Sequence, residues 1–271
     1  MTSRTAILPS LGDPFLLLAW LKLYQSWKPE VDQLLVLIRS QVNPDIGNYC
    51  KSLVESVGGT AIFQHEYIMQ HGDAIRFLLE QCQTEHVVLL EDDGWVLEPG
   101  QINKCFEKIE NNTCDIVGST RGSCNNELIS AIANKFNLHN LSSPERPLVV
   151  APNLWPNFLF AKTKDLLATD RNFNAKSWNP NETIEHINLT APTLINGDTF
   201  VWATIQLRAM GLRFNYEHQY HAGPNDRIFY IAETRLPVEP QNDGMFVIAG
   251  GSGQINPNQY AYHIHKLLLQ H

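Results

Sequence analysis

Hydrophobic positions in the first 120 residues form two alternating patterns. Short, largely apolar, strand-like runs occupy residues 5–8, 34–38, 61–63, 87–90 and 115–118, and the run over 34–38 is apolar throughout. Runs of this kind are typical of strands that are covered on both faces of a sheet. Between them, apolar residues recur at helical spacing over residues 15–27, 44–57, 73–82 and 101–109. This alternation of strands and helices predicts an α/β fold with a doubly wound, mostly parallel sheet.

The pattern is less regular from residue 125 onward. It predicts a helix over 127–136, strands around 158–161 and a helix over 199–210. The tail is rich in Gly, Pro and Asn, which favour short strands and loops. No internal repeat or low-complexity linker divides the chain. We therefore expect a single domain over residues 1–271, with a regular half at 1–122 and an irregular half at 123–271.

The length and composition are those of a globular protein with its own core. The chain has 271 residues, of which 44% are hydrophobic and 18% are charged. A chain of this size buries roughly three quarters of the surface that it exposes when unfolded. The formal net charge of −8 argues against nucleic acid as a partner, because binding to phosphates requires a basic face.

The N-terminus and the cysteines are typical of a cytoplasmic protein. No small-residue cleavage site follows an apolar run near the start, so we expect no secretory signal. The longest apolar run, residues 15–21, is far shorter than the roughly 20 residues of a membrane span. Five cysteines without a C-x-x-C pair predict reduced, mostly buried thiols. We expect a cytoplasmic location and no transmembrane segment; peripheral attachment to a membrane stays open.

Three consecutive carboxylates, Glu91, Asp92 and Asp93, follow the fourth strand-like run. Open parallel sheets bind ligands beyond the carboxyl ends of their strands. Adjacent carboxylates repel one another there unless a cation neutralises them, and hard oxygen ligands suit Mg²⁺ or Mn²⁺. Backbone alternation sends Glu91 and Asp93 to one side and Asp92 to the other. The pattern favours a site for a metal ion and a phosphate group; the alternative is an acidic turn that caps the next element.

The run over residues 87–93, Val-Val-Leu-Leu-Glu-Asp-Asp, resembles the strand and Asp-x-Asp-type signature of GT-A fold glycosyltransferases. Residues 71–76, His-Gly-Asp-Ala-Ile-Arg, are similar to the small-residue turn and Arg-bearing helix that precede this signature in the family. The opening strand, which ends at Pro9 and Ser10, is similar to the family's nucleotide-binding first strand. The resemblance covers about the first 120 residues well and the next 100 loosely. It departs from the family at Glu91, which takes the place of the first Asp, so Asp93 is the stronger candidate ligand.

The resemblance implies a GT-A type sheet with flanking helices and an irregular C-terminal lobe that binds the acceptor. It also implies that Mn²⁺ or Mg²⁺, held by Asp93 with Glu91 or Asp92, bridges the diphosphate of a nucleotide sugar. The residues that would line or border the donor nucleotide are Pro9, Ser10, Asp13, Arg39, Gly72, Asp73 and Arg76. Three of them also have plainer explanations: Arg39 as a solvated strand end, Arg76 as a charge on a helix surface, and Asp73 as a helix N-cap.

A further acidic residue, Asp198, precedes the helix expected over residues 199–210. An inverting sugar transfer needs a carboxylate that accepts the proton of the acceptor hydroxyl while this oxygen attacks the anomeric carbon. Inverting GT-A enzymes often carry an acidic residue at a helix start in this place, so the resemblance implies that Asp198 is the general base. Capping of the helix would by itself also explain an aspartate here.

Three other residues are candidates for the site. Metal-dependent members often place a third metal ligand, frequently His, near the position of His221, and an imidazole ligand suits Mn²⁺ better than Mg²⁺. Trp155 and Asn157 would bind the acceptor, with the indole ring as a platform for a sugar. Trp178 is a further candidate platform. Burial in the core is the alternative for the tryptophans, and a hydrogen-bonded loop position is the alternative for the histidine.

We therefore expect a metal-dependent, inverting glycosyltransferase with a UDP-sugar as donor. The acceptor would be a hydroxyl group of a glycan, a lipid-linked molecule or a small molecule in polysaccharide synthesis. Two other classes stay open. A nucleotidyltransferase also has acids at strand ends, but it usually has a Gly-rich basic loop after its first strand, and residues 9–14 contain neither Lys nor Arg. The second is a nucleotide-sugar-binding module without catalytic activity.

Overall fold

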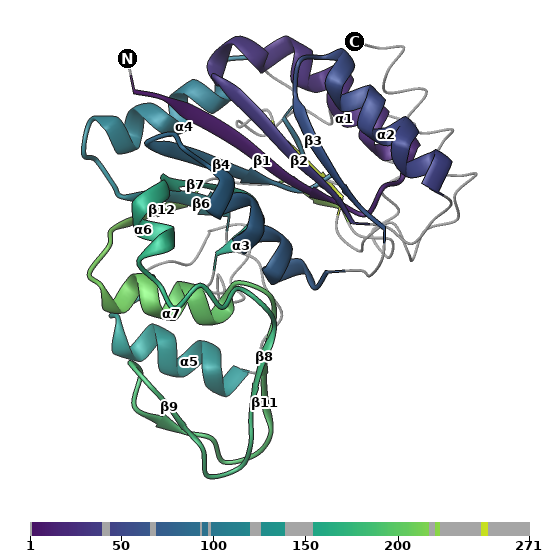
Figure 1. Ribbon diagram of the computed structural model, residues 1–271. Helices are drawn as coiled ribbons and strands as arrows, with labels where there is room; N and C mark the ends of the chain where they lie inside the picture. Colours follow the sequence, from purple (N-terminus) through teal and green to yellow (C-terminus); the bar gives the residue numbers. More distant parts are fainter. Residues whose placement is uncertain are drawn as a thin grey trace.

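The computed structural model describes residues 2–39, 44–65, 69–92, 94–96, 99–119, 126–138, 154–216, 220–222 and 245–248. Strands and helices alternate through the N-terminal part of the chain (Figure 1). The strands are β1 (Arg4–Ser10), β2 (Gln33–Arg39), β3 (Thr60–Gln64), β4 (His86–Leu90), β5 (Gly94–Val96) and β6 (Ile116–Ser119). The helices are α1 (Pro14–Trp27), the short 3₁₀ helix η1 (Lys28–Glu30), α2 (Pro44–Ser56), α3 (His71–Gln81) and α4 (Gln101–Glu110). The elements expected over this part are confirmed, with ends that differ by two residues or fewer.

The C-terminal part is built from shorter elements. Its helices are α5 (Asn126–Lys135), α6 (Thr163–Leu167) and α7 (Val201–Ala209). Its strands are β7 (Trp155–Lys162), β8 (Lys176–Trp178), β9 (Thr183–Ile184), β10 (Leu189–Thr190), β11 (Ile195–Gly197), β12 (Phe214–Tyr216), β13 (Tyr220–Ala222) and β14 (Met245–Ile248). The two expected helices and the strand around 158–161 are present, but α7 begins two residues later than the sequence predicts.

The centre of the described part of the chain is a seven-stranded sheet with the order β12-β6-β7-β4-β1-β2-β3. β1 pairs in parallel with β2 and β4, β2 with β3, and β6 with β12. β7 runs antiparallel to both of its neighbours, β4 and β6. The α/β fold with a mostly parallel sheet is therefore confirmed. The position of β7 between β4 and β6 is a feature that the hydrophobic pattern does not indicate.

Helices cover both faces of this sheet (Figure 1). On one face, α1, α2 and α4 share a buried hydrophobic cluster with alternate residues of the strands, Leu8 among them. On the other face, α3, α6 and α7 form a second cluster that includes the neighbouring residue Ile7. Successive side chains of a strand point to opposite faces, so a strand that is buried on both sides is apolar throughout. The continuous apolar runs of the sequence follow from this arrangement.

A third hydrophobic cluster lies on the far side of α7, where α5 and the strands β8, β9 and β11 project away from the sheet (Figure 1). α7 is buried on both sides. Ala203 and Leu207 belong to the cluster on the sheet, whereas Trp202 and Ile205 belong to the third cluster. α7 therefore connects the sheet to the projecting part.

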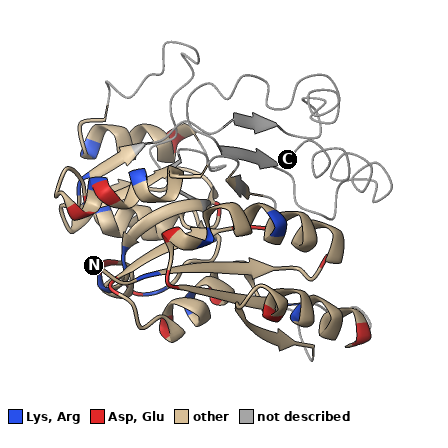
Figure 2. Cartoon of the chain, turned by 90° about the horizontal axis from the view of Figure 1, so that it is seen from above, with Lys and Arg blue, Asp and Glu red and all other residues tan. Residues whose placement is uncertain are grey.

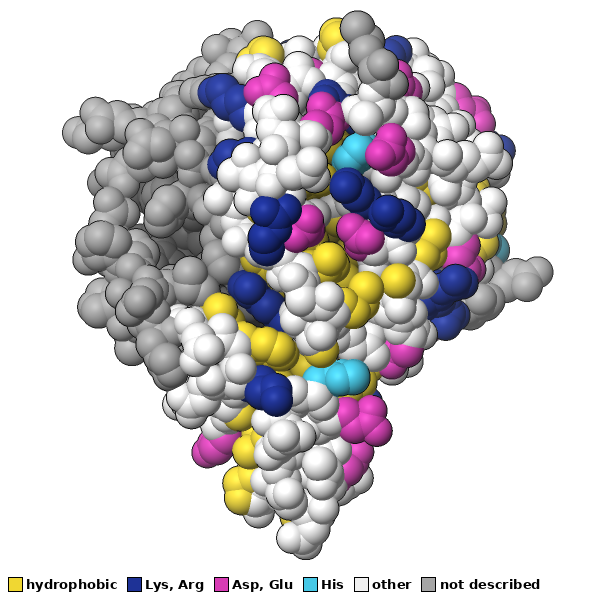
Figure 3. All heavy atoms as spheres, turned by 90° about the vertical axis from the view of Figure 1, so that its left-hand side faces the viewer, with side chains coloured by type: hydrophobic (Ala, Val, Ile, Leu, Met, Phe, Trp, Pro, Cys, Tyr) yellow, Lys and Arg dark blue, Asp and Glu magenta, His cyan; other side chains and the backbone are white. Residues whose placement is uncertain are grey.

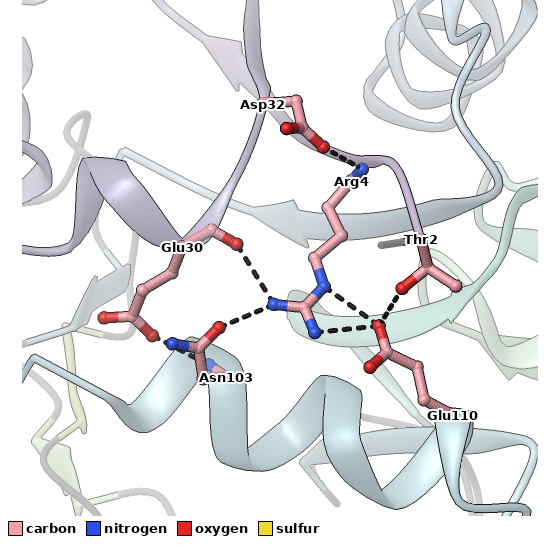
Figure 4. A network of polar contacts seen from close by, with 6 residues as sticks. All are labelled: Thr2, Arg4, Glu30, Asp32, Asn103 and Glu110. Carbon is pink, nitrogen blue, oxygen red and sulfur yellow. Dashed lines mark hydrogen bonds and ion pairs between the residues drawn. The ribbon is translucent and has the colours of Figure 1, made fainter.

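Arg4 organises a network of polar contacts at the amino-terminal end of β1 (Figure 4). Its Nε and Nη2 donate to Glu110 Oε1 at 3.0 and 2.8 Å, and its Nη1 donates to Asn103 Oδ1 at 2.5 Å. Glu30 accepts hydrogen bonds from the backbone N–H groups of Gly100 at 2.6 Å and Asn103 at 2.7 Å. Gly100 is the N-cap of α4 and has no side chain with which to cap it. Glu30 therefore caps α4 from a distant part of the chain.

Two further expectations concern membrane-spanning helices and the burial of the cysteines. No helix in the described ranges combines the length and the apolar character that crossing a membrane requires. Cys50, Cys82, Cys105 and Cys114 are buried and form no disulfide within the described residues. Cys124 lies outside the described residues.

Charged residues lie mainly on the helices and at the ends of strands in the described part of the chain (Figure 2). On the face shown in Figure 3, Lys and Arg side chains lie among Asp and Glu side chains. Hydrophobic atoms reach the surface between the main body and the narrower part of the molecule in this view. Over the described residues, this face carries mixed charge rather than charge of a single sign.

Candidate functional site

The carboxyl ends of three neighbouring parallel strands bring four candidate residues to one edge of the sheet. β1 ends at Ser10, β2 ends at Arg39, and Glu91 and Asp92 follow β4 directly. β1 lies between β2 and β4 and is parallel to both. Because parallel strands end at the same edge, the fold itself brings these side chains together.

Asp92 fixes the loop that follows β1. Its Oδ2 accepts a hydrogen bond from Ser10 Oγ at 2.7 Å and one from the Leu11 N–H at 3.2 Å. Ser10 Oγ in turn accepts from the Gly12 N–H at 3.1 Å, and the Gly12 carbonyl accepts from Cys50 Sγ at 3.5 Å. The end of β4 and helix α2 therefore hold the start of this loop in one conformation.

The edge contains a buried cation, Arg39, and a buried carboxylate, Asp92. Asp92 is 8% exposed and Arg39 is 9% exposed. Burial raises the pKa of Asp92, and the hydrogen bonds from Ser10 and Leu11 oppose this rise. Burial lowers the pKa of Arg39, and the charges of Asp92 and Glu91 oppose this change. Arg39 is therefore a buried cation in the electrostatic field of two carboxylates, not a solvated strand end.

The hydrogen bonds of Arg39 leave part of its guanidinium unused. Nη1 donates to the Met69 carbonyl at 2.9 Å. Nε is buried and has no hydrogen-bond partner within the described ranges. A buried donor without an acceptor is costly, and a ligand with acceptor oxygens could satisfy it.

His71 joins the site from the first residue of α3. Its Nε2 lies 2.9 Å from Glu91 Oε1, and both side chains are mostly buried. Sequence reasoning does not single out His71, because one histidine at a helix start has no signature of its own. The available signal is its place at the head of the segment 71–76 that resembles the glycosyltransferase family.

Gly72 and Asp73 pack against a loop from the C-terminal part of the chain. A Cβ atom on Gly72 would lie 2.1 Å from the backbone nitrogen of Asn174 and 2.2 Å from the carbonyl carbon of Phe173. Only glycine allows so close an approach. The Asp73 N–H donates to Asn174 Oδ1 at 3.2 Å. These contacts give both residues a structural role at the border of the edge.

The carboxylate of Asp73 lies 3.3 Å from Arg76 Nη2, and both side chains are partly exposed. The N-cap of α3 is Gln70, so Asp73 stands within the first turn of the helix rather than at its cap. Arg76 is therefore a cation on the helix surface with a carboxylate beside it.

Asp13 and Pro9 have local roles in the fold. Asp13 is the N-cap of α1, and its Oδ1 accepts from the N–H groups of Phe15 at 2.9 Å and Leu16 at 3.1 Å. Pro9 is buried within β1, one residue before the strand ends. Both residues lie next to the loop that Asp92 fixes.

Asp198 lies in an exposed position between β11 and α7. Its Oδ1 accepts from the Thr199 N–H at 2.7 Å, and its carbonyl accepts from the Val201 N–H at 3.1 Å. The N-cap of α7 is Phe200, which has a left-handed backbone conformation with φ of 72°. Capping of α7 therefore does not account for the aspartate at position 198.

Several candidate residues cannot be placed as side chains. Asp93 lies outside the described residues. The backbones of Trp155 and Asn157 belong to β7 and that of His221 belongs to β13, but their side chains lie outside the described part. Trp178 is 1% exposed and belongs to the third cluster, so burial explains it.

A complete metal site is not present among the described side chains. No group of three or more His, Cys, Asp and Glu residues in these ranges is arranged to hold a metal ion. Glu91 and His71 are two donors that suit Mn²⁺, and they already lie within 2.9 Å of each other. Among the described residues, Glu91 and His71 could therefore supply one carboxylate and one imidazole ligand to a metal ion. A site with more ligands would need Asp93.

Comparisons with known proteins find likeness among solved structures. No protein-family model and no curated protein matches the chain. Glucosyl-3-phosphoglycerate synthase from Mycobacterium tuberculosis, in complex with Mn²⁺, UDP-glucose and phosphoglyceric acid, is 16% identical with a TM-score of 0.41. The match covers 61% of this chain and 58% of that chain. The same synthase in complex with UDP is 16% identical with a TM-score of 0.43, over the same shares.

A further solved structure, of a mycobacterial protein, is 15% identical with a TM-score of 0.40 and covers 61% of this chain and 54% of that chain. The chain thus spans less than two thirds of the length of these proteins. At such identities and TM-scores, the likeness does not identify the activity of the chain.

Proposed function

We propose that the chain is a nucleotide-sugar glycosyltransferase that binds a UDP-sugar beyond the carboxyl ends of β1, β2 and β4. The observation that carries the proposal is the hydrogen bond between Ser10 and Asp92 at this edge. It joins the loop after β1 to the end of β4, where open parallel sheets bind their ligands. A loop that is fixed before the ligand arrives costs less ordering on binding.

The donor is a diphosphate, so its site must provide positive charge and hydrogen-bond donors. Arg39 brings to the edge a buried guanidinium whose Nε has no hydrogen-bond partner among the described residues. We assign Arg39, Gly72, Asp73 and Arg76 to the border of the donor nucleotide. Pro9, Ser10 and Asp13 would line the nucleoside, because they surround the loop that Asp92 fixes.

A divalent cation would complete the charge balance of the donor site. When bound, Mn²⁺ or Mg²⁺ would neutralise the leaving diphosphate. Glu91 would hold it together with Asp93 and His221. Asp92 Oδ2 already accepts two hydrogen bonds, so we assign Asp92 chiefly to holding the loop.

Asp198 would act as the general base. Its carboxylate would take the proton of the acceptor hydroxyl while this oxygen bonds to the anomeric carbon, and the bond from that carbon to the diphosphate breaks. Asp198 is exposed, so an acceptor can reach it, and its hydrogen bond from the Thr199 N–H orients the carboxylate. Trp155 and Asn157 would bind the acceptor. The transfer would invert the configuration of the sugar.

Release of nucleoside diphosphate from a panel of nucleotide sugars, with hydroxyl acceptors and Mn²⁺ or Mg²⁺, tests the proposal. We expect turnover of a UDP-sugar. Asp198→Asn should lower kcat by roughly 10²–10⁴-fold, as expected for a lost general base. UDP with Mn²⁺ should still raise the Tm of this variant, because Asp198 does not hold the donor. Glu185→Gln, an exposed carboxylate in the same part of the chain, is the matched control.

Three results would point elsewhere. If no nucleotide sugar is bound or turned over with any divalent cation, the proposal is wrong. Release of pyrophosphate from a nucleoside triphosphate would indicate a nucleotidyltransferase. Binding of a nucleotide sugar without turnover, across a broad panel of acceptors, would indicate a binding module.

A further inference from the structure

The loop of residues 168–175, here named the bridging loop, connects α6 to β8 and contacts the start of α3. Asn174 Oδ1 accepts from the Asp73 N–H at 3.2 Å, and Gly72 approaches the backbone of Asn174 so closely that no Cβ would fit. The N-cap residue of α3, Gln70, makes no capping hydrogen bond with its side chain. Asn174 therefore provides a cap for α3 from about a hundred residues away.

The bridging loop also contacts the start of α7. Asp170 Oδ2 accepts from Trp202 Nε1 at 2.6 Å. The Phe173 carbonyl accepts from the Phe200 N–H at 2.9 Å. The rings of Phe173 and Phe200 are fully buried and stack with centroids 5.1 Å apart. The loop is thus bonded to α3 by Asn174 and by the ion pair of Arg171 with Glu80 at 3.5 Å. It is bonded to the start of α7 by Asp170 and Phe173.

Phe200 holds a backbone conformation that large residues rarely adopt. Its φ of 72° lies in the left-handed region, where bulky side chains are outliers. Such a conformation persists when the surroundings impose it. The hydrogen bond and ring stacking from Phe173 are those surroundings, and Asp198 lies only two residues before Phe200.

The contacts of the loop extend to both proposed parts of the active site. α3 begins with His71, which lies 2.9 Å from Glu91 at the donor edge. We propose that the bridging loop sets the position of Asp198 relative to this edge, with Asn174 as the positioning residue. The inference rests on the proposed function, in which Glu91 belongs to the donor site and Asp198 is the base. A displacement of about 1 Å can cost a reaction about 10²-fold, so such a link has a measurable effect on rate.

Substitution of Asn174 tests the inference in the full chain. Asn174→Ala removes the acceptor for the Asp73 N–H, and Asn174→Asp keeps an acceptor oxygen. We expect Asn174→Ala to lower kcat by about 10-fold or more with an unchanged KM for the donor, and Asn174→Asp to restore most of the activity. Asn172→Ala, at an exposed position in the same loop, is the matched control and should keep the wild-type kcat.

A second measurement does not depend on activity. Amide hydrogen exchange of residues 198–201 in the protein without substrate should be faster in Asn174→Ala than in the wild type and in Asn172→Ala. In an Asp198→Asn background, Asn174→Ala should cause no further loss of kcat. The inference would be overturned if Asn174→Ala left the exchange of residues 198–201 unchanged. It would also be overturned if Asn174→Ala lowered kcat by the same factor in the Asp198→Asn background as in the wild type. A third outcome is faster exchange in Asn174→Ala together with no turnover of any nucleotide sugar by the wild type. It would support the role of the loop in fixing residues 198–201 and would overturn the proposed function instead.

Discussion

Ser10 and Asp92 lie 82 residues apart in the chain and are joined by a buried hydrogen bond of 2.7 Å. The bond connects the ends of two neighbouring strands, β1 and β4, through their side chains. Backbone pairing aligns these strands along their length, and the side-chain bond extends this alignment into the loop beyond. The loop should therefore depend on Asp92 for its conformation.

Ser10→Ala removes the hydroxyl donor and leaves the buried Asp92 with one hydrogen bond fewer. The free energy of unfolding should fall by about 1–3 kcal/mol, the usual cost of depriving a buried polar group of its partner. Urea unfolding measures this loss. Ser52→Ala is the control, because Ser52 is exposed and its hydroxyl donates to the Tyr49 carbonyl of the same helix, and it should change stability by less than about 0.5 kcal/mol. Equal losses in the two variants would contradict the role of Ser10.

His86 should make the protein less stable in mild acid. Its ring is buried, and neither nitrogen has a hydrogen-bond partner within the described part of the chain. Burial lowers its pKa from the ordinary 6.5; Glu85 and Glu110 oppose this change, and Lys162 and Arg4 add to it. The folded protein therefore binds a proton less readily than the unfolded chain. Stability should fall as the pH decreases from about 6.5 toward the folded pKa.

Urea unfolding of the wild type and His86→Phe, measured from about pH 7.5 to about pH 5, tests this expectation. The variant should lose less stability over this range, since it has no imidazole to protonate on unfolding. His65→Phe changes an exposed histidine and should leave the slope of the wild type unchanged. If the stability of His86→Phe fell with decreasing pH as steeply as that of the wild type, another titratable group would be responsible for the loss.

Glu30 should stabilise α4 although it lies 70 residues before the N-cap of that helix. Glu30→Ala removes the acceptors for the N–H groups of Gly100 and Asn103, and the expected loss is about 1–3 kcal/mol of unfolding free energy. The midpoint of urea unfolding reports it. Glu55→Ala, which removes an exposed partner of Lys51, should cost no more than about 0.5 kcal/mol. If Glu30→Ala lowered the free energy of unfolding as little as Glu55→Ala does, water would be replacing the carboxylate as the acceptor for these N–H groups.

The sequence predicts those parts of the fold that local patterns determine. The central residues of β1, β2 and β4 are apolar because helices cover both faces of these strands, so the positions of the strands can be predicted from the sequence. The gathering of Ser10, Arg39, Glu91 and Asp92 follows from the same rule, since parallel strands end at a common edge. The antiparallel β7 has no such signal, because strand order depends on which edges remain unpaired once the other elements have packed.

Contacts between distant segments account for the rest of the candidate site. Asn174 caps a helix that begins about a hundred residues earlier, and no spacing in the sequence connects the two. The late start of α7 comes from the left-handed Phe200, a conformation that the sequence favours at Gly or Asn but not at Phe. His71 is identified as a candidate site residue by its contact with Glu91 in the folded chain. Their roles depend on tertiary neighbours rather than on residue type.

The place of β7 in the sheet has a consequence for synthesis of the chain. A ribosome releases β4 and β6 before β7 exists, yet the neighbours of β6 in the sheet are β7 and β12. Until residues 155–162 emerge, β6 has neither partner and β4 keeps one open edge, and unpaired edges promote association between chains. Folding of this sheet must therefore wait for translation of its second half. A fragment that ends at residue 122 should aggregate rather than fold.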